Sequence, residues 1–170
     1  GPKVEIGENV IIHSHVNISG NTKIGKGNII FPFASIGNDP QDLKYNGEET
    51  SLIIGDNNKF REYVSINPGT IGGGGSTKIG NNCLFMISSH IAHDCNVGNN
   101  VIMANIATLG GHVEIGDWRN IGGGAMIHQF VKIGRQSLIG GGFSAKQDVP
   151  PFIIGAGIPS RFVGINKIGL

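Results

Sequence analysis

Four of the six histidines fall in three short motifs: HIAHDC (90–95), GGH (110–112) and IHQF (127–130). Histidine is the side chain best suited to proton transfer near neutral pH. A glycine beside such a base can present its backbone N–H to a developing oxyanion. A base, a hydrogen-bond donor and room for a carbonyl between them would suit acyl transfer.

A six-residue repeat determines how these motifs are placed. Aliphatic residues recur at every sixth position from Ile6 to Ile36, return from Ile54 to Ile66, and continue from Ile79 to Ala145, which makes 21 hexapeptides. Three hexapeptides form one triangular coil of 18 residues, so the repeat predicts an all-β parallel β-helix of about seven coils. Each coil buries its inner face by stacking on the next. We expect the residue after each aliphatic to turn the corner, where glycine tolerates a positive φ.

The coil length predicts which side chains are neighbours, because residues 18 apart stack at about 4.8 Å, the spacing of paired strands. Three stacks result: His93 with Gly111 and Gln129, Asp94 with His112, and Gly110 with His128. The three motifs therefore form one patch over successive coils. Asp94 either orients a histidine in this patch or only caps a corner. Cys83 and Cys95 fall at inward positions and are interpreted as core residues.

The chain reads as a single domain, 1–170, with three departures from the repeat. The polar segment 38–51 and the glycine-rich insert 70–77 are predicted to be external loops, which commonly carry function. After Ala145 the period fades, and 146–170 is predicted to be an irregular C-terminal cap.

Composition limits the classes of function. The formal net charge is +1, which gives no reason to expect nucleic acid as a partner. Two cysteines are too few for a disulfide framework and favour a reducing cytoplasm. No apolar run approaches the roughly 20 residues that span a membrane, so membrane insertion is not expected.

The motifs QDLKY (41–45), HIAHDC, GGH, IHQF and QDVPP (147–151) occur in an order that resembles the UDP-N-acetylglucosamine O-acyltransferases over nearly the whole chain. The resemblance implies a left-handed helix and a cytoplasmic homotrimer. It also implies transfer of a long 3-hydroxyacyl chain from acyl carrier protein to the 3-hydroxyl of UDP-N-acetylglucosamine, in lipid A synthesis. No metal or other cofactor is implied, since the carrier thioester is a co-substrate.

The same resemblance assigns roles to residues. His93 would be the general base, Asp94 would orient it, and the N–H of Gly111 would stabilise the oxyanion. The substrate-binding residues would be Gln41, Asp42 and Lys44 in the first loop, His90, His112, His128 and Gln129 in the patch, Gly141 as the position that limits acyl length, and Asn166 near the nucleotide phosphates.

Several features depart from the family pattern. The family normally begins one or two coils earlier and ends in a C-terminal helical domain, which we expect to be absent here. Asn67-Pro68 replaces a His-Arg pair, and Arg119 falls at a normally small inward position. Three other functions stay open: an acyltransferase acting on another nucleotide sugar, such as an amino sugar acylated on nitrogen, a zinc-dependent γ-type carbonic anhydrase, and a non-catalytic truncated homologue.

Overall fold

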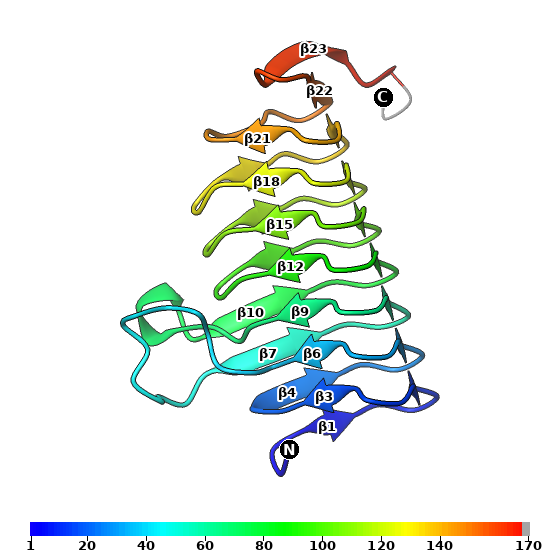
Figure 1. Ribbon diagram of the computed structural model, residues 1–170, viewed down its shortest axis with the longest axis vertical. Helices are drawn as coiled ribbons and strands as arrows, with labels where there is room; N and C mark the ends of the chain where they lie inside the picture. Colours follow the sequence, from blue (N-terminus) through cyan, green and yellow to red (C-terminus); the bar gives the residue numbers. More distant parts are fainter. Residues whose placement is uncertain (168–170) are drawn as a thin grey trace.

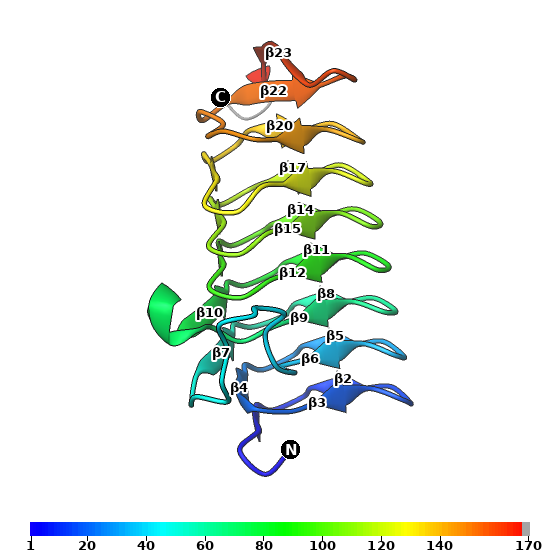
Figure 2. The same ribbon diagram turned by 60° about the vertical axis from the view of Figure 1, so that its left-hand side comes forward.

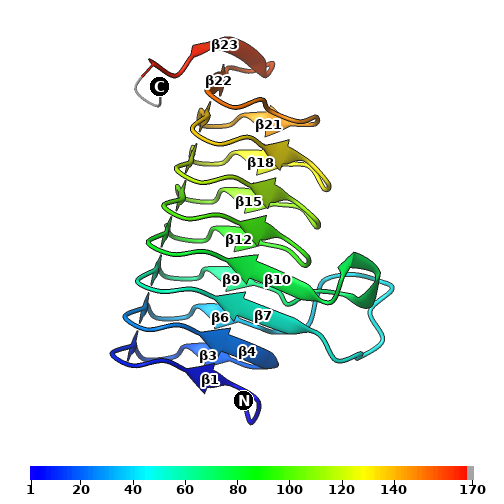
Figure 3. The same cartoon turned by 180° about the vertical axis from the view of Figure 1, so that it is seen from behind.

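The protein forms a left-handed parallel β-helix, seen in a computed structural model that describes residues 1–167 (Figure 1). The N-terminus lies at one end of a triangular column and the C-terminal hairpin at the other (Figures 1 and 3). Each of the 21 predicted hexapeptides contributes one strand, β1 to β21, and the strands up to β18 each pair in parallel with the strand one coil further on. The predicted fold class is confirmed.

Three sheets form the faces of the column. Sheet A contains β1 (Glu5–Ile6), β4 (Asn21–Ile24), β7 (Ser51–Ile54), β10 (Ser76–Ile79), β13 (Asn96–Val97), β16 (Glu114–Ile115) and β19 (Lys132–Ile133). Sheet B contains β2 (Ile11–Ile12), β5 (Ile29–Ile30), β8 (Lys59–Phe60), β11 (Leu84–Phe85), β14 (Ile102–Met103), β17 (Asn120–Ile121), β20 (Leu138–Ile139), β22 (Ile153–Ala156) and β23 (Arg161–Ile165). Sheet C contains β3 (Asn17–Ile18), β6 (Ser35–Ile36), β9 (Ser65–Ile66), β12 (His90–Ile91), β15 (Thr108–Leu109), β18 (Met126–Ile127) and β21 (Ser144–Ala145).

From β1 to β21 the register advances by 18 residues per coil except at the two inserts. Ile91 pairs with Leu109 at the ordinary step. Ile36 pairs with Ile66 across the first loop, a step of 30 residues, and Ile66 pairs with Ile91 across the glycine-rich insert, a step of 25. Both inserts leave at the turns that lead from sheet C to sheet A, which we call the C–A edge. The other two edges are named A–B and B–C in the same way.

The interior is a narrow aliphatic column. Every repeat aliphatic from Ile24 to Ala145 is buried, as are the residues two positions before them, including Cys83 and Cys95. Both cysteines are free thiols whose pKa burial raises, Cys83 to about 11 and Cys95 to about 12. Their prediction as core residues is confirmed.

The expectation about corner glycines was wrong. A positive φ occurs mainly at the third residue after the repeat aliphatic, where asparagine and even Tyr63 and Trp118 are found. The glycine directly after the aliphatic is needed for another reason. A Cβ on Gly7 would lie 2.7 Å from the carbonyl carbon of Gly25, so glycine here permits close approach between coils.

The C-terminal segment is more regular than predicted. Within the expected irregular cap, β22 pairs in parallel with β20 and continues sheet B (Figure 2), and β23 returns antiparallel to β22. The unpaired edge of the last coil provides backbone partners that extend the sheet beyond the repeat. The described residues contain no α-helix, and their 3₁₀ helix, Ile71–Gly73, is too short to cross a membrane.

Candidate active site

The three histidine motifs occupy consecutive turns on the C–A edge, after β12, β15 and β18. The loop between β6 and β7 and the glycine-rich insert between β9 and β10 project from the same edge, below the motifs (Figures 1 and 3). The β-helix therefore brings the motifs QDLKY, HIAHDC, GGH and IHQF together on the C–A edge.

His93 and Asp94 form a hydrogen-bonded dyad. Nδ1 of His93 lies 2.8 Å from Oδ2 of Asp94, and the Asp94 side chain has no exposed surface. An ionised carboxylate can only accept, so Nδ1 donates its proton and the neutral ring keeps a lone pair on Nε2. Of the two roles considered for Asp94, orientation of a histidine is the one that the geometry supports.

Asp94 is itself held by the glycine-rich insert. The backbone N–H of Thr70 donates to Oδ1 at 2.8 Å, and the Thr70 hydroxyl donates to Oδ2 at 2.6 Å. The backbone N–H of Asp94 donates to the Thr77 hydroxyl at 2.8 Å. The φ of Asp94 is 60°. The carboxylate is thus fully hydrogen-bonded without solvent.

Gly111 lies directly against the His93 ring, as the stacking predicted. A Cβ at Gly111 would come within 2.6 Å of Cε1 and 2.7 Å of Nε2 of His93, so only glycine leaves room for the imidazole. Within residues 1–167, the Gly111 N–H donates no hydrogen bond, while its carbonyl accepts from Phe130. An unengaged N–H beside a base is the arrangement that an oxyanion hole requires.

His112 lies beside the dyad. Its Nε2 is 3.9 Å from Oδ2 of Asp94, its ring meets that of His93 edge-on, and it stacks on Phe130 with ring centres 4.4 Å apart. His112 also borders a hollow of about 380 Å³ that Gly73 and Asp94 help to line. The ring is oriented but only partly covered, so it can reach a ligand.

His90 stands on sheet C one coil above Ser65, with Nδ1 2.7 Å from the Ser65 hydroxyl. Burial lowers the pKa of His90, and the positive charge of a protonated His93 acts in the same direction, while the bond to Ser65 opposes the shift. His90 is therefore neutral at pH 7 and can serve as a hydrogen-bonding group.

His128 and Gln129 are exposed in the turn after β18, where Nδ1 of His128 lies 3.2 Å from the Gln129 carbonyl. In the first loop, Gln41 and Lys44 are exposed and Asp42 is half-buried, with Oδ1 accepting from the Lys44 N–H. These polar groups belong to the same edge as the dyad.

The buried Asn67 explains one departure from the family pattern. Its Nδ2 donates to the carbonyls of Asn38 and Asp39, each at 3.0 Å, and so ties down the start of the first loop. Asn67 therefore has a structural role at the loop base.

Two predicted residues lie on other edges of this chain. Gly141 is exposed in the turn between β20 and β21, on the B–C edge. Asn166 donates to the Gln136 carbonyl at 3.0 Å, on the A–B edge. Neither is brought to the His93 dyad within one chain.

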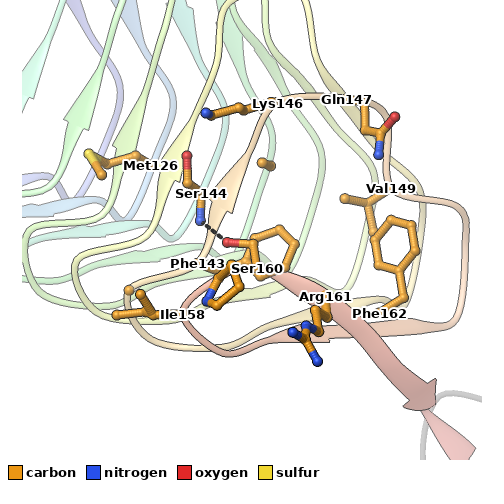
Figure 4. A pocket seen from close by; sticks show the side chains of 13 residues that line it. Met126, Phe143, Ser144, Lys146, Gln147, Val149, Ile158, Ser160, Arg161 and Phe162 are labelled. Atoms are coloured by element: carbon orange, nitrogen blue, oxygen red, sulfur yellow. Dashed lines mark hydrogen bonds between the residues drawn. The ribbon is translucent and has the colours of Figure 1, made fainter.

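A pocket of about 700 Å³ opens one coil above His128 and Gln129 (Figure 4). The core residues Phe143 and Val149 line it, and Ile158 and Phe162 of the C-terminal segment contribute further apolar surface. The Ser144 N–H donates to the Ser160 hydroxyl at 2.8 Å and joins this segment to β21. The space is mostly apolar and of a size that suits a hydrocarbon chain.

Two residues of the site, Ser65 and Thr70, could not be reached by counting 18 positions. Both contact the histidine motifs across the glycine-rich insert, where the step is 25 residues, whereas Thr77 follows the insert and lies 17 positions before Asp94. Aligning the repeat aliphatics Ile66 and Ile91 would have placed Ser65 under His90. Phe130 lies 18 positions after His112, so its spacing and aromatic type are the sequence signal for the ring stack between them.

Among the described residues, His93, Asp94 and His112 are the one group whose donor atoms could surround a metal ion. A catalytic zinc site needs three ligands that turn their lone pairs inward. Here Oδ2 of Asp94 already accepts from Thr70 and from Nδ1 of His93, so the geometry fits an oriented base better than a zinc site.

Several known proteins are similar to this chain in sequence and in fold. A protein from Aliarcobacter butzleri named acyl-[acyl-carrier-protein]–UDP-N-acetylglucosamine O-acyltransferase is 58% identical over 147 residues, which cover 86% of this chain and 56% of that protein. LpxA from Acinetobacter baumannii superposes with a TM-score of 0.98 at 49% identity, covering 99% of this chain and 66% of that one. The chain thus spans somewhat over half of the first and about two thirds of the second.

A third relative is covered more completely. LpxA from Bacteroides fragilis, a UDP-N-acetylglucosamine acyltransferase, has a TM-score of 0.94 and 41% identity over 99% of this chain and 73% of its own. No family model matches the chain. The identity to these relatives and the coverage of the last one show that this chain belongs to the UDP-N-acetylglucosamine O-acyltransferase family.

Proposed function

We propose that this chain moves a long 3-hydroxyacyl chain from acyl carrier protein to the 3-hydroxyl of UDP-N-acetylglucosamine, with His93 as general base. The observation that carries the proposal is the His93 ring, oriented by Asp94 and stacked on the bare backbone of Gly111. The names of the relatives support the substrates. Such a reaction would begin lipid A synthesis.

The chemistry follows from the dyad. Nε2 of His93 accepts the proton of the sugar hydroxyl while that oxygen attacks the carbonyl carbon of the thioester. The carbonyl oxygen becomes an oxyanion, and the Gly111 N–H donates to it. The carbon–sulfur bond then breaks, and the leaving thiolate takes the proton from His93. The products are the ester and the free carrier thiol, so no external acid or cofactor is consumed.

The polar groups along the C–A edge support the proposed substrate contacts. We assign His90, His112, His128 and Gln129 to the sugar, the diphosphate and the acyl group. Gln41, Asp42 and Lys44 would hold the nucleotide sugar and the pantetheine arm of the carrier. In this assignment the loop supplies the ammonium group of Lys44 and the carboxylate of Asp42, because the Asp94 carboxylate of the patch is already bonded to Thr70 and His93.

The acyl chain would extend toward the apolar pocket of Figure 4. Gly141 lies beside Gly142, one of the lining residues, and a Cβ on Gly141 would meet only the backbone of Gly123, at 3.3 Å. The lack of a side chain at this position supports a long acyl chain. We assign Asn166 to the nucleotide phosphates of a neighbouring subunit's site, because its own chain places it on another edge.

A homotrimer is part of the proposal. On the B–C edge, His15, Phe33 and Tyr63 form an exposed stack with ring centres 5.0 and 5.1 Å apart. Phe33 and Tyr63 are 48% and 55% exposed, and Ile106 on the same edge is 63% exposed. An apolar ridge of this kind typically marks a protein interface. A trimer would also let Gly141 and Asn166 meet the patch of another subunit.

A cytoplasmic location accompanies these substrates. The two cysteines are free and buried, which agrees with a reducing compartment. Acyl carrier protein, the proposed partner and donor, would supply its thioester there.

The test is an assay of purified protein with 3-hydroxyacyl carrier protein. We expect thioester consumption only when UDP-N-acetylglucosamine is present, and His93→Ala should lose at least ~10²-fold in rate. Glu8→Ala, which alters an exposed side chain on the A–B edge of the first coil, should keep the wild-type rate. Near-normal turnover by His93→Ala would refute the mechanism.

The same assay separates the other candidates. An absolute preference for an acceptor with a 3-amino group would assign the chain to nitrogen acylation. Stoichiometric zinc with CO₂ hydration would indicate a carbonic anhydrase, and failure to bind either substrate in calorimetry would indicate a non-catalytic homologue.

A further inference from the structure

Thr70 makes two hydrogen bonds to the Asp94 carboxylate and is itself 5% exposed. Its hydroxyl donates to Oδ2, the same oxygen that accepts from Nδ1 of His93. Its backbone N–H donates to Oδ1. The three donors fix the plane of the carboxylate and its rotation about the Cβ–Cγ bond.

The glycine-rich insert locks Thr70 in this position. The carbonyl of Thr70 accepts from the N–H of Gly73 at 3.0 Å and of Gly75 at 2.8 Å, around the 3₁₀ helix Ile71–Gly73. Gly73 passes so close to Asp94 that a Cβ there would overlap the carboxylate. The insert therefore packs directly against the Asp94 carboxylate.

The direction of the His93 ring depends on this carboxylate. Asp94 is the residue whose side chain contacts Nδ1 of His93, and a carboxylate free to rotate would no longer select one ring orientation or one tautomer. A displacement of about 1 Å in a reacting group can cost ~10²-fold in rate.

We propose that Thr70 is a positioning residue for acyl transfer, which holds Asp94 so that His93 keeps its proton on Nδ1 and turns Nε2 toward the substrate. The inference rests on the proposed function. Through Thr70, the glycine-rich insert would act on the rate of acyl transfer and not only on substrate binding.

The experiment compares Thr70→Val, Thr70→Ala and Thr70→Ser. Both variants without a hydroxyl should lower kcat by ~10-fold to ~10²-fold with KM unchanged, whereas Thr70→Ser should stay within about threefold of wild type. The matched control is Thr22→Val, which removes another buried hydroxyl, bonded to the Ser19 carbonyl on a distant coil. It should lower the melting temperature without changing kcat.

A second readout does not depend on turnover. In ¹⁵N-edited NMR spectra of the imidazole rings, wild type and Thr70→Ser should show one His93 tautomer, protonated on Nδ1. Thr70→Val should show a mixture. If Thr70→Val and Thr70→Ala keep both the single tautomer and the wild-type kcat, the inference is wrong and the proposed function stands. If no variant, including wild type, transfers acyl groups, the NMR result still decides whether Thr70 holds the dyad.

Discussion

At the scale of single residues, the site depends on contacts that leave almost no tolerance. His93 is 15% exposed and lies between a buried carboxylate and a glycine with no room for a side chain. The ring can move neither toward Asp94 nor toward Gly111. Small changes at these positions are therefore expected to alter rate much more than stability.

Gly111→Ala tests this contact. The new methyl group would lie 2.6 Å from Cε1 of His93, so the ring must swing away from its place beside the N–H donor. We expect kcat to fall at least ~10²-fold while the melting temperature changes little. Gly164→Ala, where a Cβ meets nothing within 4 Å, is the control. Full activity in Gly111→Ala would contradict the stacking as the basis of catalysis.

His90 gives a prediction about pH. Its folded-state pKa lies below the ordinary value of 6.5, so below that pH the unfolded chain binds more protons and the folded state loses stability as pH falls. His90→Gln should therefore show a smaller drop in melting temperature between pH 7.5 and 5.5 than wild type. His128→Gln, which changes an exposed histidine in the turn after β18, should keep the wild-type drop. Equal drops in all three proteins would argue against His90 as the cause.

Much of the site could be predicted from the residues because a solenoid converts spacing into position. Counting 18 places His93 under Gly111 and Asp94 under His112, and both contacts exist. The count fails for Thr70 and Ser65, which act across an insert of a length that periodicity does not encode. It also cannot show which edge carries Asn166, because the chain after β21 no longer follows the repeat.

At the scale of elements, the turns carry most of the site residues, and the strands set the distance between them and supply His90. The inward position two before each repeat residue mostly holds a small or uncharged residue, and Arg119 is the charged residue found there. It is fully buried, with Nη1 3.2 Å from the Trp118 carbonyl. Its Nε and Nη2 have no hydrogen-bond partner in the part of the chain that the structure describes. Burial lowers its pKa to about 10.

Arg119→Met should stabilise the protein. Methionine fills similar space without a buried charge, and replacements of this type contribute about 1–4 kcal/mol in other proteins. The measurement is the melting temperature by circular dichroism, with Arg135→Met, an exposed arginine on the same edge, as control. A lower melting temperature in Arg119→Met would mean that the guanidinium meets a partner, such as internal water.

At the scale of the whole molecule, the three edges of the column have different characters. The C–A edge is polar and carries the dyad, whereas the B–C edge presents the aromatic stack of His15, Phe33 and Tyr63. One edge thus suits substrates and another suits a second copy of the chain.

Tyr63→Glu should break the proposed trimer, because a charge would be buried among aromatic rings. Light scattering after gel filtration should show a shift toward the monomer mass of 17.8 kDa. Trp118→Glu changes a similarly exposed aromatic residue on the A–B edge and should leave the assembly intact. Dissociation by Trp118→Glu alone would move the interface to that edge.

The constant rise of the coils limits how such a column can be adjusted. Backbone positions along an edge are available only in increments of about 4.8 Å, since hydrogen bonding between coils admits no intermediate height. Small changes in the length of the accepted acyl chain must therefore come from the size of side chains at fixed heights, as at Gly141. Gain or loss of a whole coil would change the accepted length by a full increment of about 4.8 Å or more.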